Sequence, residues 1–177
     1  MALVVWLSGL SGAGKSTLSQ AALPLLAGRG LSARVLDGDA LRPVLSPGLG
    51  FGRADVAENN GRIARHCLGI AAEADVLLVP VIAPYAQARA AIRAILGDAM
   101  ALVWVKAGLD TVMARDPKGL YGKARAGEIP DMVGYADGYP YEPPTDADLI
   151  IDTETTAPDE AAGILVDFIA AKWGERT

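Results

Sequence analysis

The sequence predicts an α/β protein in which helices cover both faces of a parallel sheet. Five apolar runs lack the polar alternation of half-exposed strands, which is typical of strands that are buried on both faces. These runs are residues 2–7, 33–37, 75–82, 101–105 and 148–152. Alanine-rich stretches that favour helix alternate with them or follow the last one, at 15–29, 54–74, 85–96 and 158–173. This order predicts right-handed crossovers between parallel strands, with ligands bound beyond the carboxyl ends of the strands.

The composition predicts one domain that spans residues 1–177. A chain of this length that is 51% hydrophobic can build a single well-packed core. Its formal net charge of −5 argues against nucleic acid as a main partner. The first apolar run begins too early to leave room for a signal peptide, and no run reaches the roughly 18 residues that span a membrane. A single cysteine, Cys67, fits a reducing compartment, so we expect a cytoplasmic protein with no membrane partner.

A glycine-rich segment, WLSGLSGAGKST, follows the first apolar run. The spacing of Gly9, Gly14, Lys15 and Ser16 is typical of a phosphate-binding loop, in which backbone N–H groups surround the phosphates of a nucleotide. The lysine then reaches the β- and γ-phosphates, and the serine hydroxyl binds Mg²⁺ that arrives with the nucleotide. A glycine-rich turn that happens to precede a lysine is the alternative. The strand before the loop and the helix after it favour phosphate binding.

Two carboxylates, Asp37 and Asp39, stand at the end of the second apolar run. In an extended backbone their side chains would share one face. One could then hold Mg²⁺ through water while the other orients or deprotonates an acceptor hydroxyl. An ordinary turn is the alternative, because Asp and Gly often cap loops at strand ends. With Lys15, these two residues are the catalytic candidates, and Ser16 and Asp37 are the metal candidates.

A segment of about thirty residues, roughly 115–145, separates the fourth and fifth apolar runs and is rich in glycine, proline and charge. A disordered linker is one interpretation. The segment is internal, however, and the chain returns to a strand after it. Long loops of this kind in compact domains are usually functional, so we favour a mobile lid over the nucleotide.

Taken together, these motifs resemble those of the adenylylsulphate kinase (APS kinase) family, whose members phosphorylate the ribose 3′-hydroxyl of adenosine 5′-phosphosulphate with MgATP. The similarity covers nearly the whole chain. The matching segments are GLSGAGKST, LDGDALR, LGFGRADVAENNGRIAR, PVIAPYAQAR, RDPKGLYGKARAGEI and YEPP. The resemblance implies a P-loop kinase fold of three α/β/α layers with a lid, two substrates (ATP and a small nucleotide acceptor), and a homodimer.

The resemblance also implies roles for individual residues. ATP phosphates would bind the loop, and Arg115 would come down with the lid. The residues of the loop are Gly9, Gly12, Ala13, Gly14, Lys15, Ser16 and Thr17. Asp39 and Arg42 would engage the acceptor, and Lys118 would contact both the acceptor and the transferring phosphate. The adenine of the acceptor would stack on Phe51, in a pocket whose further candidates are Asn59, Ile82, Ala83 and Met132.

The sequence departs from the family pattern mainly on the acceptor side. Val56 replaces an arginine expected to bind the phosphosulphate, and Arg53, Arg62 and Arg65 are the residues that could compensate. A serine and an aromatic residue of the family are also replaced, and a lid lysine has become a glycine. The residues present at these positions are Ala83, Met132 and Gly122. An alternative function is therefore phosphorylation of another nucleotide such as cytidine diphosphoramidate. A nucleotide-binding regulatory protein without turnover is the third hypothesis.

Overall fold

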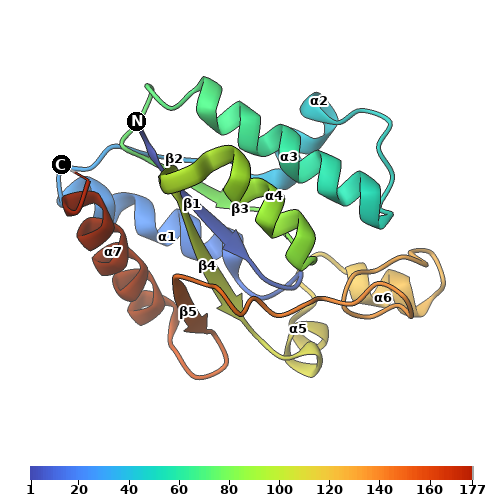
Figure 1. The fold of residues 1–177 in the computed structure, drawn as a ribbon. Helices are drawn as coiled ribbons and strands as arrows, with labels where there is room; N and C mark the ends of the chain where they lie inside the picture. Colours follow the sequence, from blue (N-terminus) through green and yellow to red (C-terminus); the bar gives the residue numbers. More distant parts are fainter. Residues whose placement is uncertain (177) are drawn as a thin grey trace.

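The computed structural model describes residues 1–176 and contains one sheet of five parallel strands in the order β2-β3-β1-β4-β5 (Figure 1). The strands are β1 (Leu3–Ser8), β2 (Ala33–Val35), β3 (Val76–Pro80), β4 (Met100–Lys106) and β5 (Leu149–Asp152). Central β1 pairs with β3 on one side and β4 on the other. The predicted parallel sheet is confirmed, because each apolar run forms one strand.

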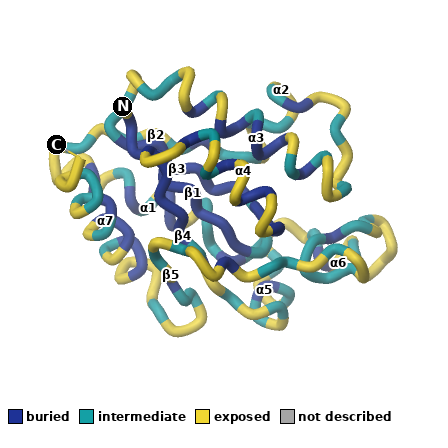
Figure 2. The backbone as a smooth tube through the Cα atoms, in the orientation of Figure 1, coloured by how far each residue is buried: buried dark blue, intermediate teal, exposed yellow. Residues whose placement is uncertain are grey.

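Helices cover both faces of this sheet and complete three layers. On one face, α1 (Lys15–Gly28) and α7 (Pro158–Gly174) bury Leu3, Val5 and Leu7 of β1. On the other face, α3 (Arg53–Gly69) and α4 (Ala86–Leu96) bury Val4 and Trp6. Successive side chains of a strand point to opposite faces, so a strand between two helical layers must be apolar throughout. Figure 2 shows the result as buried central strands β1, β3 and β4 inside helices with exposed outer surfaces, while the edge strands β2 and β5 are less buried.

The helices differ from the expected ranges at three places. α3 ends at Gly69 instead of 74, because the chain turns there, with Ala71 N–H bonded to the Leu68 carbonyl and Glu73 N–H bonded to the Ile70 carbonyl. α2 (Gly38–Leu45) was not expected, since its eight residues include Pro43. The lid segment also contains a short helix, α6 (Leu120–Arg125).

Connections at the carboxyl ends of the strands carry the predicted site. The phosphate loop lies between β1 and α1, and α2 follows β2. Beyond β4 the chain forms α5 (Leu109–Arg115) and α6, then runs without further regular structure to β5 (Figure 1). Among the described residues, no helix is long and apolar enough to cross a membrane.

Candidate functional site

A cavity of about 960 Å³ opens at the carboxyl ends of the strands. Its wall includes the phosphate loop, the start of α2, one face of α3, the residues after β3, the lid segment and the residues after β5. Segments that are far apart in the sequence therefore meet around one space. The volume falls within the upper part of the range usual for small-molecule sites.

Gly9 and Gly14 of the phosphate loop occupy positions that require glycine. At Gly9, where β1 ends, a Cβ atom would collide with the Val105 carbonyl oxygen of β4. Gly14 is the residue immediately before α1 and has a φ of 100°, which side chains rarely adopt. These two constraints bring the loop close to the sheet and direct the N-terminus of α1 into the cavity. The positive end of that helix favours a bound anion.

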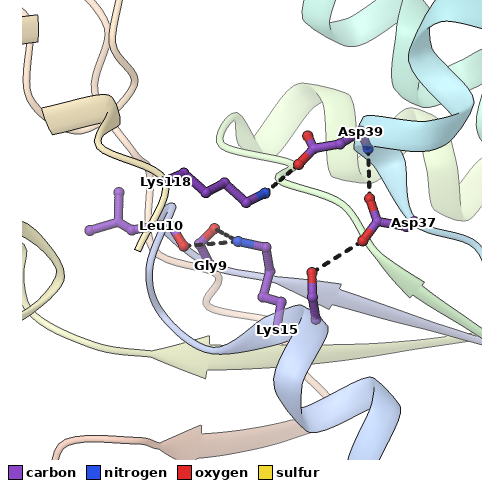
Figure 3. A network of polar contacts seen from close by, with 7 residues as sticks. Gly9, Leu10, Lys15, Asp37, Asp39 and Lys118 are labelled. Atoms are coloured by element: carbon purple, nitrogen blue, oxygen red, sulfur yellow. Dashed lines mark hydrogen bonds and ion pairs between the residues drawn. The ribbon is translucent and has the colours of Figure 1, made fainter. Parts of the chain in front are cut away.

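The Lys15 ammonium lies inside the loop (Figure 3). It donates hydrogen bonds of 2.8 Å to the backbone carbonyls of both Gly9 and Leu10. Burial, together with the nearby charge of Lys118, lowers the pKa of Lys15 from its usual 10.5 to about 8, although Asp39 and Asp37 act in the opposite direction. A cation held in this way is poised to gain from the negative charge of nucleotide phosphates.

Ser16 and Asp37 come together as predicted, although Asp37 does not lie on a strand. β2 ends at Val35, and Asp37 caps α2 by accepting a 2.8 Å hydrogen bond from the backbone N–H of Asp39. The expected extended pair is therefore wrong, because the cap of α2 sets the geometry. The other carboxylate oxygen of Asp37 accepts a hydrogen bond from the Ser16 hydroxyl at 3.3 Å.

Hydroxyl and carboxylate oxygens are the ligands that Mg²⁺ prefers, and this ion usually keeps waters and substrate phosphates as further ligands. The residues described here contain no cluster of three or more His, Cys, Asp or Glu side chains that could enclose a metal. The Ser16–Asp37 pair therefore fits an ion that arrives with a nucleotide, and does not form a protein cage.

Asp39 and Lys118 form an ion pair across the cavity, between α2 and the lid segment (Figure 3). Both side chains remain accessible, with 76% of Asp39 and 51% of Lys118 exposed. An exposed pair of this kind contributes little to stability. The pair is therefore free to rearrange when a substrate enters.

Arg115, at the end of α5, lies against the residues that follow β5. Its guanidinium donates to the Thr153 carbonyl at 2.7 Å and to the Thr153 hydroxyl at 3.0 Å. That hydroxyl in turn donates to the Ala13 carbonyl in the phosphate loop at 3.0 Å. The chain of contacts places a cation beside the loop, as the ATP-binding prediction requires.

On the acceptor side of the cavity, the guanidinium of Arg42 lies next to an exposed aromatic ring. Arg42 of α2 lies 4.3 Å from the centroid of Phe51, and it donates to the carbonyl of Gly50. Phe51 is 56% exposed, so the ring is available for stacking on a base. Met132 of the lid segment contributes a buried apolar side chain to the same cavity.

None of the three arginines expected to compensate for Val56 lines the cavity. Arg53 pairs with Glu142 at 2.7 Å and lies over the ring of Tyr85, while Arg62 and Arg65 both contact Glu58. Val56 itself is 5% exposed. The compensation hypothesis therefore finds no support in the geometry. The cations in the described part of the wall are Lys15, Arg42, Arg115 and Lys118.

The lid segment is anchored to the phosphate-loop region by two tyrosines. Tyr121 is fully buried and donates from its hydroxyl to the Ser11 carbonyl at 3.1 Å. Further along, the hydroxyls of Tyr141 and Ser8 lie 2.9 Å apart. These contacts tie the segment to the body at two points and give it an ordered path over the cavity.

Apart from the three arginines, the wall contains all but two of the site residues proposed from the sequence. Gly9 and Ala83 lie behind it, and Ala83 is fully buried, with its carbonyl accepting a 2.8 Å hydrogen bond from Arg89. Sequence reasoning missed other wall residues because they belong to no phosphate-binding or metal-binding motif. These residues include Asn60, Val133, Thr153, Thr156 and Pro158.

Comparisons with known proteins agree with this geometry. A family model described as adenylylsulphate kinase matches residues 1–152. The adenylyl-sulfate kinase of Deinococcus deserti is 45% identical over 166 residues, which cover 94% of this chain and 90% of that protein. The structure of the APS kinase of Mycobacterium tuberculosis in complex with AMPPNP and APS is similar with a TM-score of 0.88 at 40% identity, covering 96% of this chain and 98% of that one.

A hexameric APS kinase from Thiobacillus denitrificans is also similar, with a TM-score of 0.67 at 29% identity. This similarity covers 96% of the present chain and 29% of that one. The resemblance first indicated by the motifs is thus confirmed by a match over most of the sequence and by the fold. The chain belongs to the adenylylsulphate kinase family and has the P-loop kinase fold.

Proposed function

We propose that this protein transfers the γ-phosphoryl group of ATP to the ribose 3′-hydroxyl of adenosine 5′-phosphosulphate, which gives 3′-phosphoadenylylsulphate and ADP. The observation that carries the proposal is that the phosphate loop with Lys15 shares one cavity with Asp39, Lys118 and Phe51. Family membership adds the substrate class.

Residues of the phosphate loop and its neighbours would bind the ATP phosphates and Mg²⁺. The phosphate loop and Lys15 would hold the β- and γ-phosphates, with Arg115 beside the loop. Ser16 and Asp37 would hold Mg²⁺, and the ion would neutralise charge on the phosphates when it is bound. Phosphoryl transfer needs mainly such positioning and charge stabilisation.

Asp39 would act on the acceptor. Its carboxylate would accept the proton of the 3′-hydroxyl as that oxygen bonds to the γ-phosphorus and the bond to the β-phosphate oxygen breaks. Lys118, now paired with Asp39, would move to the transferring phosphate. Position 83 is an alanine and offers no hydroxyl for a phosphorylated serine intermediate, so transfer would be direct.

We further propose that one kinase domain spans residues 1–177, with a lid at about 115–145 that opens for substrates. We also propose that the protein works as a cytoplasmic homodimer in sulphate assimilation. The hexameric relative supports self-association in the family.

A second candidate acceptor, cytidine diphosphoramidate, is favoured by Val56 and Met132 in the cavity wall. The first removes a cation where a phosphosulphate would lie, and the second replaces an aromatic ring that would enclose adenine. The loss of the aromatic ring would suit a base other than adenine, such as the smaller cytosine.

An assay of purified protein with MgATP and adenylylsulphate tests the proposal. We expect a 3′-phosphorylated product at micromolar substrate. No product well above that concentration would overturn the assignment, and stronger thermal stabilisation by cytidine nucleotides than by adenylylsulphate would favour the second acceptor. Absence of ATP consumption with every acceptor would instead indicate a regulatory nucleotide-binding protein.

A further inference from the structure

Asn60, in the middle of α3, has a buried side chain with an unused hydrogen-bond acceptor. The residue is 1% exposed and belongs to the cavity wall. Within residues 1–176, its Oδ1 atom has no hydrogen-bond partner, and the Oδ1 atom of its neighbour Asn59 in the same wall has none either. A buried oxygen without a partner is destabilising, and most such atoms in native proteins are paired. The feature therefore calls for a group that is brought from outside the chain.

The orientation of this amide follows from its other contact. Asn60 Nδ2 donates to the Ile82 carbonyl at 3.3 Å. A carbonyl only accepts hydrogen bonds, so a flipped amide would place two acceptor oxygens against each other. The Nδ2 atom must face Ile82, and Oδ1 is left as an acceptor. What is missing is a donor.

The position of Asn60 points to the base of a nucleotide. Asn59 and Asn60 follow Val56 by three and four residues, so all three lie on the face of α3 that lines the cavity. Ile82, the partner of Asn60, lies in the same wall. Under the function proposed above, this wall lies beside the base that stacks on Phe51.

We propose that Asn60 determines the base specificity of the acceptor site by accepting a hydrogen bond from an exocyclic amino group. Adenine and cytosine carry such a group, whereas hypoxanthine and uracil present a carbonyl oxygen in its place. An oxo base would leave Oδ1 unpaired and place a second oxygen near it. Sites built around a buried polar atom reject ligands that fail to pair with it.

Equilibrium binding of adenylylsulphate and of its hypoxanthine counterpart tests this proposal. Calorimetry is carried out with saturating Mg²⁺ and AMPPNP, so that the phosphate loop is occupied and only the acceptor site is titrated. We expect the wild-type protein to prefer the amino base by about tenfold to a hundredfold. Asn60→Leu, which has a similar volume and no acceptor, should reduce this preference to about twofold or less, mainly by weakening the adenine ligand.

Ser46→Ala provides a matched control. Ser46 is 2% exposed, and its hydroxyl also lacks a partner in the described part of the chain, but it lies outside the cavity wall. Its replacement should leave the base preference unchanged. Equal binding of the two bases by the wild type would overturn the proposal even if Asn60→Leu did not fold. An unchanged preference in a folded Asn60→Leu protein would also overturn it.

The proposal rests on the proposed function, but the two can fail separately. If adenylylsulphate is not phosphorylated, the function is wrong, and the same titrations are repeated with cytidine and uridine diphosphates. A preference for cytosine that Asn60→Leu removes would then support the role of Asn60. If adenylylsulphate is phosphorylated but its hypoxanthine counterpart binds as tightly as adenylylsulphate does, only the role of Asn60 is wrong.

Discussion

The two halves of the cavity are built differently. In the half that faces the phosphate loop, Gly9 is packed against β4 and Lys15 is held by two backbone carbonyls. In the half that faces the acceptor, Phe51 is 56% exposed, and the Asp39–Lys118 pair is also open to solvent. One half is preorganised by backbone, whereas the other presents side chains on α2, α3 and the lid segment.

This difference corresponds to what each half must recognise. Triphosphates are the same in every reaction of this class, and backbone N–H groups that surround them leave little room for substitution. The acceptor is recognised by side chains, which can change one at a time without disturbing the sheet. The departures from the family pattern at Val56 and Met132 lie in this second half.

The largest expected effect is on the preorganised half. Lys15→Ala removes the cation from the β- and γ-phosphates and should lower kcat on the order of a thousandfold. The fold should survive, because the ammonium contacts only loop carbonyls. Steady-state kinetics and a melting curve check both statements. Lys172→Ala, which removes an exposed lysine of α7, is the control, and nearly unchanged activity of Lys15→Ala would refute the loop assignment.

The acceptor half should respond to restoration of its missing cation. Val56→Arg should tighten adenylylsulphate binding by roughly 30-fold or more if the guanidinium reaches the phosphosulphate. Val56 packs against Tyr85 and Ala88, so the free energy of unfolding should fall by about 1–3 kcal/mol. Calorimetry and chemical denaturation measure the two effects separately. No gain in affinity would mean that another residue already fills this role.

The pH dependence of nucleotide binding distinguishes the two halves further. Because the pKa of Lys15 is lowered to about 8, the free protein loses this charge as the pH rises through 8. Phosphates favour the ammonium form, so binding above this pH requires uptake of a proton. The Kd for AMPPNP with Mg²⁺ should rise up to about tenfold per pH unit above 8.

Lys15→Arg remains charged over this range and is the control for that titration. Its Kd should be nearly independent of pH between 7.5 and about 9.5. The Kd for adenylylsulphate, which binds the acceptor half, should depend less on pH than the Kd for AMPPNP. A flat profile for the wild-type protein with AMPPNP would contradict the role of Lys15.

The smallest expected effect concerns an arginine that does not reach the cavity. Arg53→Ala removes the contacts with Glu142 and Tyr85, so the free energy of unfolding should fall by at most about 1 kcal/mol. The KM for adenylylsulphate should not change measurably. A rise of about tenfold would show that Arg53 binds the acceptor after all.

Much of the fold could be read from local patterns. Continuous apolar runs became strands, because a strand between two helical layers has no face for polar residues. One helix was missed: α2 is only eight residues long and contains Pro43, a residue that usually interrupts helices. Because Asp37 caps this helix, Asp37 and Asp39 do not lie on an extended strand as expected.

For this protein, the sequence by itself determined the parallel sheet, the phosphate loop and the family, because each depends on residues that are close together in the chain. Only the tertiary structure decided which distant side chains share the cavity. It excluded Arg53, Arg62 and Arg65 from the wall and placed Asn60 in it. The physical reason is that partners such as Glu142 for Arg53 and Ile82 for Asn60 lie far away in sequence, so no local pattern encodes these contacts.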